Sequence, residues 1–176
     1  MEVENRTQTR NNMPILMLPT ILCVNKKSIY KELGMNCYDQ DRNAYTFMGS
    51  EPVICHPPCQ QWSRLKHFAI YNREERDLAH FCLEKIHKNG GILEHPEGSS
   101  FFKEAGIKPT ISIDQFWFGF PARKRTYLYF HGYKPVQMPL KFDAIEKKVT
   151  QMSYKKRSDT TKELAIWLIK SITDFR

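Results

Sequence analysis

The sequence lacks an apolar stretch long enough to cross a membrane. Its longest apolar run, residues 15–24, is interrupted by Pro19 and is far shorter than the roughly 20 residues that a spanning helix needs. Glu2 and Glu4 precede the run, and no small-residue cleavage site follows it, so a secretory signal is not expected. These absences predict a cytoplasmic protein without membrane segments.

A disulfide framework is also absent. The five cysteines among 176 residues are odd in number and unevenly spaced, which is typical of a protein in a reducing compartment. The mean hydropathy of −0.55 and the 12% of aromatic residues argue against both a membrane protein and a disordered chain. The 27 Lys and Arg residues outnumber the 19 Asp and Glu residues, and the net charge of +8 favours a polyanionic partner without identifying it.

The length is sufficient for one domain with a single core. Residues 1–12 are polar and without apolar periodicity, so they predict a flexible N-terminal tail. The remaining residues, 13–176, predict a single α/β domain of the kind that forms a catalytic core. No repeat or low-complexity segment divides it.

Hydrophobic periodicity and turn residues predict alternating strands and helices. Strands are expected within residues 15–24, 52–55, 92–93, 110–113 and 126–130, and helices within 26–33, 74–88 and 160–172. The strand–helix–strand order of residues 52–93 predicts a parallel crossover. Residues 110–113 and 126–130 predict a hairpin-like pair at one end of the sheet. The expected fold is therefore a small, mostly parallel sheet with flanking helices. Residues 35–50 are expected to be irregular, and the basic segment 147–157 is expected to be flexible.

Cys59 follows a predicted strand directly, in the segment Pro57-Pro58-Cys59-Gln60. The carboxyl end of a strand is where open α/β sheets bind ligands. The crossover would bring a second strand end, which carries Glu94, beside the first. A thiol and a carboxylate in one site suit chemistry at carbon 5 of a pyrimidine, because a thiolate must add to carbon 6 while an acidic group at ring nitrogen 3 stabilises the charge that develops.

These residues resemble motifs of the DNA cytosine-5 methyltransferase family. Cys59 within Pro-Pro-Cys-Gln is similar to the nucleophile motif, and Glu94 is similar to the glutamate of Glu-Asn-Val, here Glu-His-Pro. A third segment, residues 118–128, resembles Tyr-Gly-Val-Pro-Gln-x-Arg-x-Arg, with Lys124 in the place of the first of its two arginines. The motifs occur in family order over residues 52–132 and are similar to those of a minimal, phage-type relative with a trimmed Rossmann-like methyltransferase core.

The resemblance implies roles for particular residues. Cys59 would attack carbon 6 of cytosine and Glu94 would hold nitrogen 3, while a basic residue of the 123–125 segment would contact the substrate. The residues expected at the catalytic or substrate-binding site are Cys59, Glu94, Arg123, Lys124, Arg125, Pro58, Gln60, Trp62, Ser63, His95 and Gln115. The expected partner is DNA, whose target base must be flipped out, or a pyrimidine nucleotide.

The cofactor expected from the resemblance is S-adenosylmethionine. The family's glycine-rich cofactor loop should follow the first strand, but residues 21–26 contain no glycine, and no long insert resembling a target-recognition domain is present. Binding of S-adenosylmethionine would therefore require an unusual loop at residues 24–28, with Asp39 or Asp41 on a ribose.

Other interpretations remain open. The chain could be a non-catalytic nucleic-acid or nucleotide-binding protein derived from this fold. Trp62 could be a packing residue, Ser63 a helix cap, and the basic residues 123–125 a solvated loop. Cys55-His56-Pro57-Pro58-Cys59 has no second paired cluster, so no metal site is predicted. His95 and Glu97 lack the downstream cysteine pair of zinc deaminases, which excludes deamination by that route.

Overall fold

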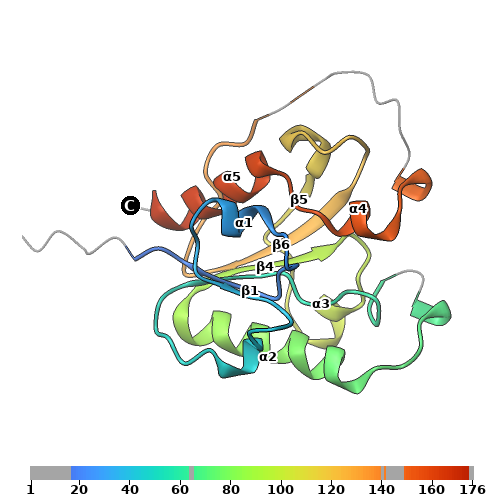
Figure 1. Cartoon of the computed structure of the whole chain (residues 1–176), viewed down its shortest axis with the longest axis horizontal. Coiled ribbons are helices and arrows are strands. Elements are labelled where there is room, and N and C mark those ends of the chain that lie inside the picture. The colour runs from blue at the N-terminus through green and yellow to red at the C-terminus, as the bar shows by residue number, and fades with distance from the viewer. Residues whose placement is uncertain (1–16, 64–65, 140, 142–148, 175–176) are drawn as a thin grey trace, which may run out of the picture.

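The computed structural model describes residues 17–63, 66–139, 141 and 149–174. The strands of the described residues form one six-stranded sheet in the order β2-β1-β3-β4-β6-β5 (Figure 1). The predicted tail, residues 1–12, lies outside the described residues. The strands are β1 (Thr20–Leu22), β2 (Cys37–Tyr38), β3 (Val53–Cys55), β4 (Gly91–Pro96), β5 (Ile111–Asp114) and β6 (Arg125–His131).

The sheet is mixed, so the expectation of a mostly parallel sheet is wrong. Strands β2, β1, β3 and β4 run parallel to one another, whereas β6 is antiparallel to both β4 and β5. The predicted parallel crossover from β3 to β4 and the predicted antiparallel pair of β5 and β6 are both confirmed. The sheet is mixed because β6 enters between β4 and β5 and so contributes two antiparallel pairings.

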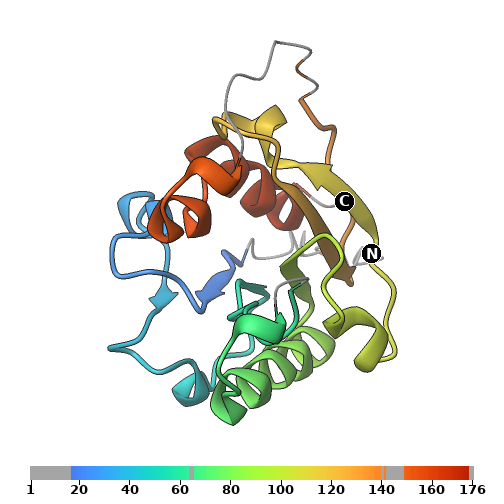
Figure 2. The same ribbon diagram turned by 90° about the vertical axis from the view of Figure 1, so that its right-hand side faces the viewer.

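Helices cover both faces of the sheet. In Figure 1, α2 (Arg73–Asn89) and α3 (Phe101–Glu104) lie below it, and α1 (Ile29–Glu32) and α5 (Lys162–Thr173) lie above it. Figure 2 shows β1 between α5 and α2. The fifth helix of the described residues is α4 (Tyr154–Ser158). No described helix is both long enough and apolar enough to span a bilayer.

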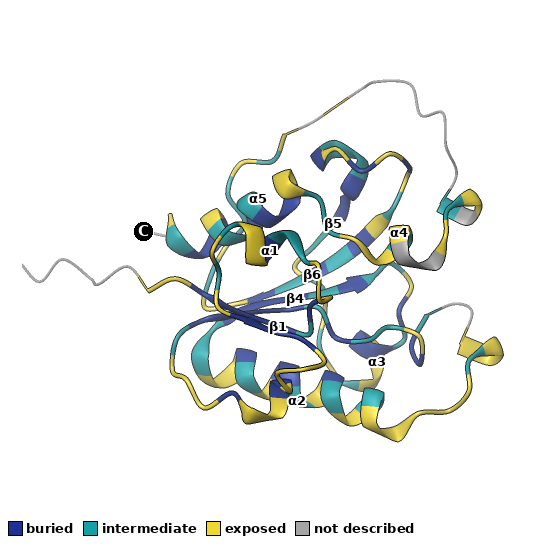
Figure 3. Cartoon of the chain, viewed as in Figure 1, coloured by how far each residue is buried: buried dark blue, intermediate teal, exposed yellow. Residues whose placement is uncertain are grey.

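Alternation along the strands divides the core into two layers. Ile21, Ile54 and Ile92 pack on the side of α5, whereas Leu22 and Leu93 pack on the side of α2. Figure 3 shows the buried strands between helices whose outer sides are exposed. This arrangement follows from the period of two in a strand, because consecutive side chains point to opposite faces.

Helix α2 and strand β4 occupy the positions that the sequence predicts. Asn72 accepts a hydrogen bond from the backbone N–H of Glu75 at 3.3 Å and so begins the helix. At Gly91 a Cβ atom would lie 2.0 Å from the carbonyl oxygen of Val53. Glycine therefore allows β4 to pair closely with β3, which places Glu94 beyond the end of β3.

Three elements do not appear among the predictions. Strand β2 has two residues, and α3 and α4 have four and five, so none is long enough to show a hydrophobic period. Strand β2 lies within residues 35–50, which were expected to be irregular. Helix α4 overlaps residues 147–157, which were expected to be flexible, and ends one residue beyond them.

Candidate functional site

The strand order places a topological switch point between β1 and β3. The chain leaves β1 for β2 on one side, whereas β3 leads to β4 on the other. In open α/β sheets, ligands bind outside the carboxyl ends of the strands at such a point. The backbone N–H of His56 donates to the carbonyl oxygen of Leu22 at 3.1 Å, which fixes the chain after β3 against the end of β1.

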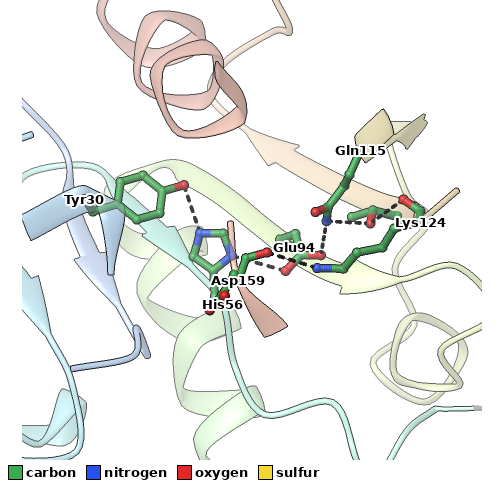
Figure 4. Close-up of polar contacts among 7 residues, drawn as sticks. Tyr30, His56, Glu94, Gln115, Lys124 and Asp159 are labelled. Carbon is green, nitrogen blue, oxygen red and sulfur yellow. Dashed lines mark hydrogen bonds and ion pairs between the residues drawn. The ribbon is translucent and has the colours of Figure 1, made fainter. Parts of the chain in front are cut away.

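Glu94 is the centre of a hydrogen-bond network at this edge of the sheet (Figure 4). Its Oε2 lies 3.1 Å from Nδ1 of His56, and Nε2 of His56 lies 3.0 Å from the hydroxyl of Tyr30. Its Oε1 accepts from Nε2 of Gln115 at 3.4 Å, and the same amide nitrogen donates to Oγ1 of Thr126 at 2.9 Å. Side chains from α1, β4, β6 and the segments after β3 and β5 thereby converge on one carboxylate.

The charges around Glu94 keep it ionised. Burial by itself would raise the pKa of this carboxyl group, but the hydrogen bond and electrostatic attraction of His56 and the positive charge of Lys124 lower the pKa to about 2. An ionised carboxylate only accepts hydrogen bonds, so Nδ1 of His56 carries a proton. Each carboxylate oxygen has two acceptor positions, and Glu94 can therefore accept further hydrogen bonds from a ligand.

Cys59 lies in the turn that follows β3 and is partly exposed. Its carbonyl oxygen accepts from the backbone N–H groups of Trp62 and Ser63 at 3.1 and 2.9 Å, which holds the turn. Burial of the thiol and the negative charge of Glu94 raise its pKa to about 11, while the positive charge of Lys124 acts in the opposite direction. The thiol is therefore close to both charged groups, and it is protonated at neutral pH.

Among the three basic residues of the 123–125 segment, Lys124 is the one that faces Glu94 and Cys59. Burial lowers its pKa, and the charges of Glu94 and Cys59 oppose that change. Its Nζ donates to the carbonyl oxygen of Asp159, 3.4 Å away (Figure 4). The structure thus brings Lys124 to the candidate site from the loop before β6.

The two arginines of this segment are held elsewhere. Arg123 forms an ion pair with the buried carboxylate of Asp114, and Arg125 pairs with Glu97 at 2.7 Å. Both side chains are more than half exposed, at 62% and 59%. They anchor the ends of the loop, whereas the side chain between them lies beside Glu94.

Trp62 and His95 lie inside the protein. The ring of Trp62 is 1% exposed and contacts Phe101 edge to face, with 5.0 Å between ring centroids, so it packs in the core and offers no open face to a base. His95 is fully buried and its Nδ1 lies 2.8 Å from Oγ of Ser99. Because side chains alternate along β4, His95 points to the opposite face from Glu94.

The remaining predicted residues lie near the turn or the carboxylate. Pro58 and Ser63 are half-buried and Gln60 is exposed, all beside Cys59 in the chain. The carbonyl oxygen of Ser63 accepts from the N–H of Lys66, where a short 3₁₀ helix begins. Gln115 is 1% exposed and acts on Glu94 through the hydrogen bond described above.

Several groups in the loop after β1 are engaged in contacts within the protein. The backbone N–H of Val24 donates to the carbonyl oxygen of Tyr38 at 3.1 Å, and Val24 is buried. Oγ of Ser28 accepts from the N–H of Tyr30 at 3.4 Å and so caps α1. Cys23 has a φ of 63°, a left-handed conformation that usually requires glycine.

The two candidate ribose ligands are also engaged in protein contacts. Asp39 lies directly after β2, where its Oδ2 pairs with Lys31 and its Oδ1 accepts from the N–H groups of Asp41 and Arg42, both at 2.9 Å. These contacts hold the pKa of Asp39 at about 2. Asp41 is exposed and pairs with Lys26 at 2.7 Å.

The sequence did not indicate that His56 and Tyr30 belong to the hydrogen-bond network of Glu94. His56 stands directly before the Pro57-Pro58-Cys59 segment, and its place after a strand was the signal that could have identified it. Tyr30 is fully buried in α1, and no local sequence pattern distinguishes it from an ordinary core residue.

Neither the protein-family models nor the curated proteins compared with this chain include a match. The chemistry of the site therefore rests on the residues described above.

Proposed function

We propose that this protein is a pyrimidine-modifying enzyme of the cytosine-5 type, in which the Cys59 thiolate adds to carbon 6 of the ring. The observation that carries the proposal is the partly buried, ionised carboxylate of Glu94, close to a thiol and a lysine. These three groups come from separate strand ends and stand in the sequence order of the cytosine-5 methyltransferase motifs. The order of the parallel strands, β2-β1-β3-β4, is one that doubly wound α/β sheets adopt. This order supports a Rossmann-like core.

Glu94 acts by accepting hydrogen bonds from the edge of the pyrimidine. With a pKa of about 2 it is a carboxylate throughout the physiological range, so the proton at ring nitrogen 3 comes from solvent and not from Glu94. The carboxylate then stabilises the N3–H and the neighbouring 4-amino group. Withdrawal of electrons toward nitrogen 3 makes carbon 6 a better electrophile. His56 and Gln115 hold the carboxylate in place.

Cys59 acts as the nucleophile after it loses its proton. Its pKa of about 11 leaves a small thiolate fraction at neutral pH, and Lys124 provides the positive charge that favours the thiolate. Addition forms a bond between Sγ and carbon 6 and places the electron pair at carbon 5. Carbon 5 then attacks an electrophilic donor, whose leaving group departs with the electron pair of the broken bond. Loss of the carbon 5 proton, departure of the thiolate from carbon 6 and return of the nitrogen 3 proton to solvent restore the ring.

The loop after β1 lacks the glycine residues of the family's cofactor motif, because residues 21–26 contain none. Both carboxylate oxygens of Asp39 and the hydroxyl of Ser28 already accept hydrogen bonds within the protein. Asp41 is exposed and paired with Lys26. We therefore propose no role for this loop in cofactor binding and assign no donor to the group that carbon 5 receives.

A second candidate is a nucleic-acid or nucleotide-binding protein that keeps the pyrimidine site without turnover. The raised pKa of Cys59 favours it, because a protonated thiol does not add to carbon 6. In this candidate too, Lys124 is the cation beside the carboxylate of Glu94, because Arg123 and Arg125 form ion pairs elsewhere. The two candidates differ in whether a covalent bond to Cys59 forms.

A mechanism-based probe separates these candidates. Oligonucleotides that contain 5-azacytosine, single- and double-stranded, would be incubated with the full chain at pH 8.5, and the intact protein mass measured. The enzyme proposal predicts a 1:1 covalent adduct that Cys59→Ala abolishes and that Cys37→Ala, a matched control, leaves unchanged. Binding without an adduct, measured by fluorescence anisotropy, would contradict the enzyme proposal and support the second candidate.

A further inference from the structure

Two thiols meet on the α2 side of the sheet, away from Cys59. Cys23 follows β1 and Cys82 lies in α2, 59 residues later, yet their Sγ atoms are 3.5 Å apart. A disulfide bond is about 2.04 Å long, so the two sulfurs must approach by about 1.5 Å to be joined. The pair belongs to none of the groups that the proposed chemistry uses.

The two sulfurs differ in access. Cys82 is fully buried, whereas Cys23 is half-buried at the end of a surface loop. Cys55 is buried nearby, but its Sγ contacts the carbonyl oxygen of Cys82, at 4.0 Å. A small oxidant would therefore reach Cys23 first, and Cys82 is the thiol placed to displace it.

The backbone conformation at Cys23 is unusual for a cysteine. Its φ of 63° lies in the left-handed region, where glycine is the least strained residue. A cysteine there places a sulfur against α2, which glycine could not do. The hydrogen bond to Cys82 and burial also raise the pKa of Cys23 well above its usual value, so Cys23 is protonated at neutral pH.

We propose that Cys23 and Cys82 form a reversible disulfide through exchange with a low-molecular-weight disulfide. The Cys23 thiolate attacks one sulfur of the oxidant and releases the first small thiol, which leaves a mixed disulfide. The Cys82 thiolate then attacks Sγ of Cys23 and releases the second small thiol. Two electrons and two protons pass from the protein to the oxidant, which is reduced to two thiols.

The disulfide would tie the loop after β1 to α2 at the switch point of the sheet. Leu22 and His56 are hydrogen-bonded at the same edge, so the cross-link would fix the backbone next to the Glu94 network. This modification does not depend on the proposed function, because it needs only the two thiols and the oxidant.

The test uses the folded full chain and oxidised glutathione at pH 8. After incubation, acid quenching and alkylation in denaturant, intact mass reports how many of the five cysteines remain as thiols. We expect three alkylated cysteines, a cross-linked peptide that joins Cys23 to Cys82, and five alkylated cysteines after treatment with dithiothreitol. The reaction should be faster at pH 9 than at pH 7, because both thiols must ionise.

Variants make the assignment specific. Cys23→Ser and Cys82→Ala should each prevent the cross-link, while Cys37→Ser, a control, should keep it; circular dichroism verifies that each variant is folded. Five alkylated cysteines in the wild type at equilibrium would overturn the proposal. So would glutathione carried on Cys59 without a Cys23–Cys82 bond, or a bond between Cys55 and Cys82.

Discussion

At the residue scale, neighbouring side chains on β4 have opposite roles. Glu94 faces the candidate site and is ionised, whereas His95 faces the α2 layer and is fully buried. Burial lowers the pKa of His95 to about 4 from an ordinary value of 6.5. The motif that the sequence suggested as one substrate-contacting unit is therefore divided by the alternation of the strand.

His95 gives a prediction about stability and pH. Below pH 6.5 the unfolded chain gains a proton at this histidine that the folded chain does not bind until about pH 4. The free energy of unfolding should therefore fall by about 3 kcal/mol between pH 6.5 and 4 from this group. Urea unfolding of the wild type and of His95→Leu at several pH values measures it. Equal pH dependence in both proteins would contradict the assignment.

Cys59 gives a prediction about rate and pH. Because its pKa is about 11, the thiolate fraction grows about tenfold for each pH unit between 7 and 9. Single-turnover adduct formation with a 5-azacytosine oligonucleotide should increase in proportion. Replacement of Lys124 by Gln should slow the reaction at every pH, since it removes the cation that favours the thiolate. A rate that is constant above pH 7 would mean that the free protein already holds the thiolate.

At the scale of elements, the loop between β5 and β6 positions Lys124. Asp114 ends β5, is 2% exposed, and accepts from the backbone N–H groups of Phe116 and Lys124 at 3.2 and 3.0 Å while pairing with Arg123. One buried carboxylate thus fixes both ends of the loop. The loop reaches the candidate site because β6 runs antiparallel to β4.

Replacement of Asp114 by Asn should destabilise the protein by about 1–3 kcal/mol, because one acceptor becomes a donor that faces Arg123. Arg123→Gln is the matched control and should cost about 1 kcal/mol or less, since the arginine is 62% exposed. Chemical denaturation of both variants provides the comparison. A smaller loss for Asp114→Asn than for Arg123→Gln would contradict this account of the loop.

The longer elements were predictable from the sequence because each carries its own period and end signals. Helix α2 shows a 3.6-residue period between Asn72 and Gly90, and the turn at Pro57-Pro58 marks the end of β3. Strand β2 was not predictable, since its two residues acquire a strand conformation by pairing with β1. The mixed sheet was not predictable because the position of β6 depends on tertiary packing.

The site was predictable where a motif and a strand end coincide, as at Cys59 and Glu94. It was not predictable for Tyr30 and His56, whose roles depend on contacts between α1, β3 and β4. The choice of Lys124 over its two neighbouring arginines needed the ion pairs of those arginines with Asp114 and Glu97, which no local sequence pattern shows.

At the scale of the whole molecule, the net charge of +8 bears on the partner. If the substrate is an oligonucleotide, its affinity should fall by about twentyfold between 50 and 200 mM salt for roughly three phosphate contacts on a single strand. A pyrimidine mononucleotide should show a much weaker dependence. Anisotropy titrations over a salt series measure both. Oligonucleotide affinity that does not change with salt would exclude phosphate contacts as the source of binding.

The most direct test of the account is to locate the covalent bond in the 5-azacytosine adduct. We expect one oligonucleotide per protein, attached to the peptide that contains Cys59. The yield of this adduct should be at least tenfold lower in Glu94→Gln. No adduct at any pH between 7 and 9, or an adduct on another cysteine, would contradict the central claim that Cys59 and Glu94 form a pyrimidine site.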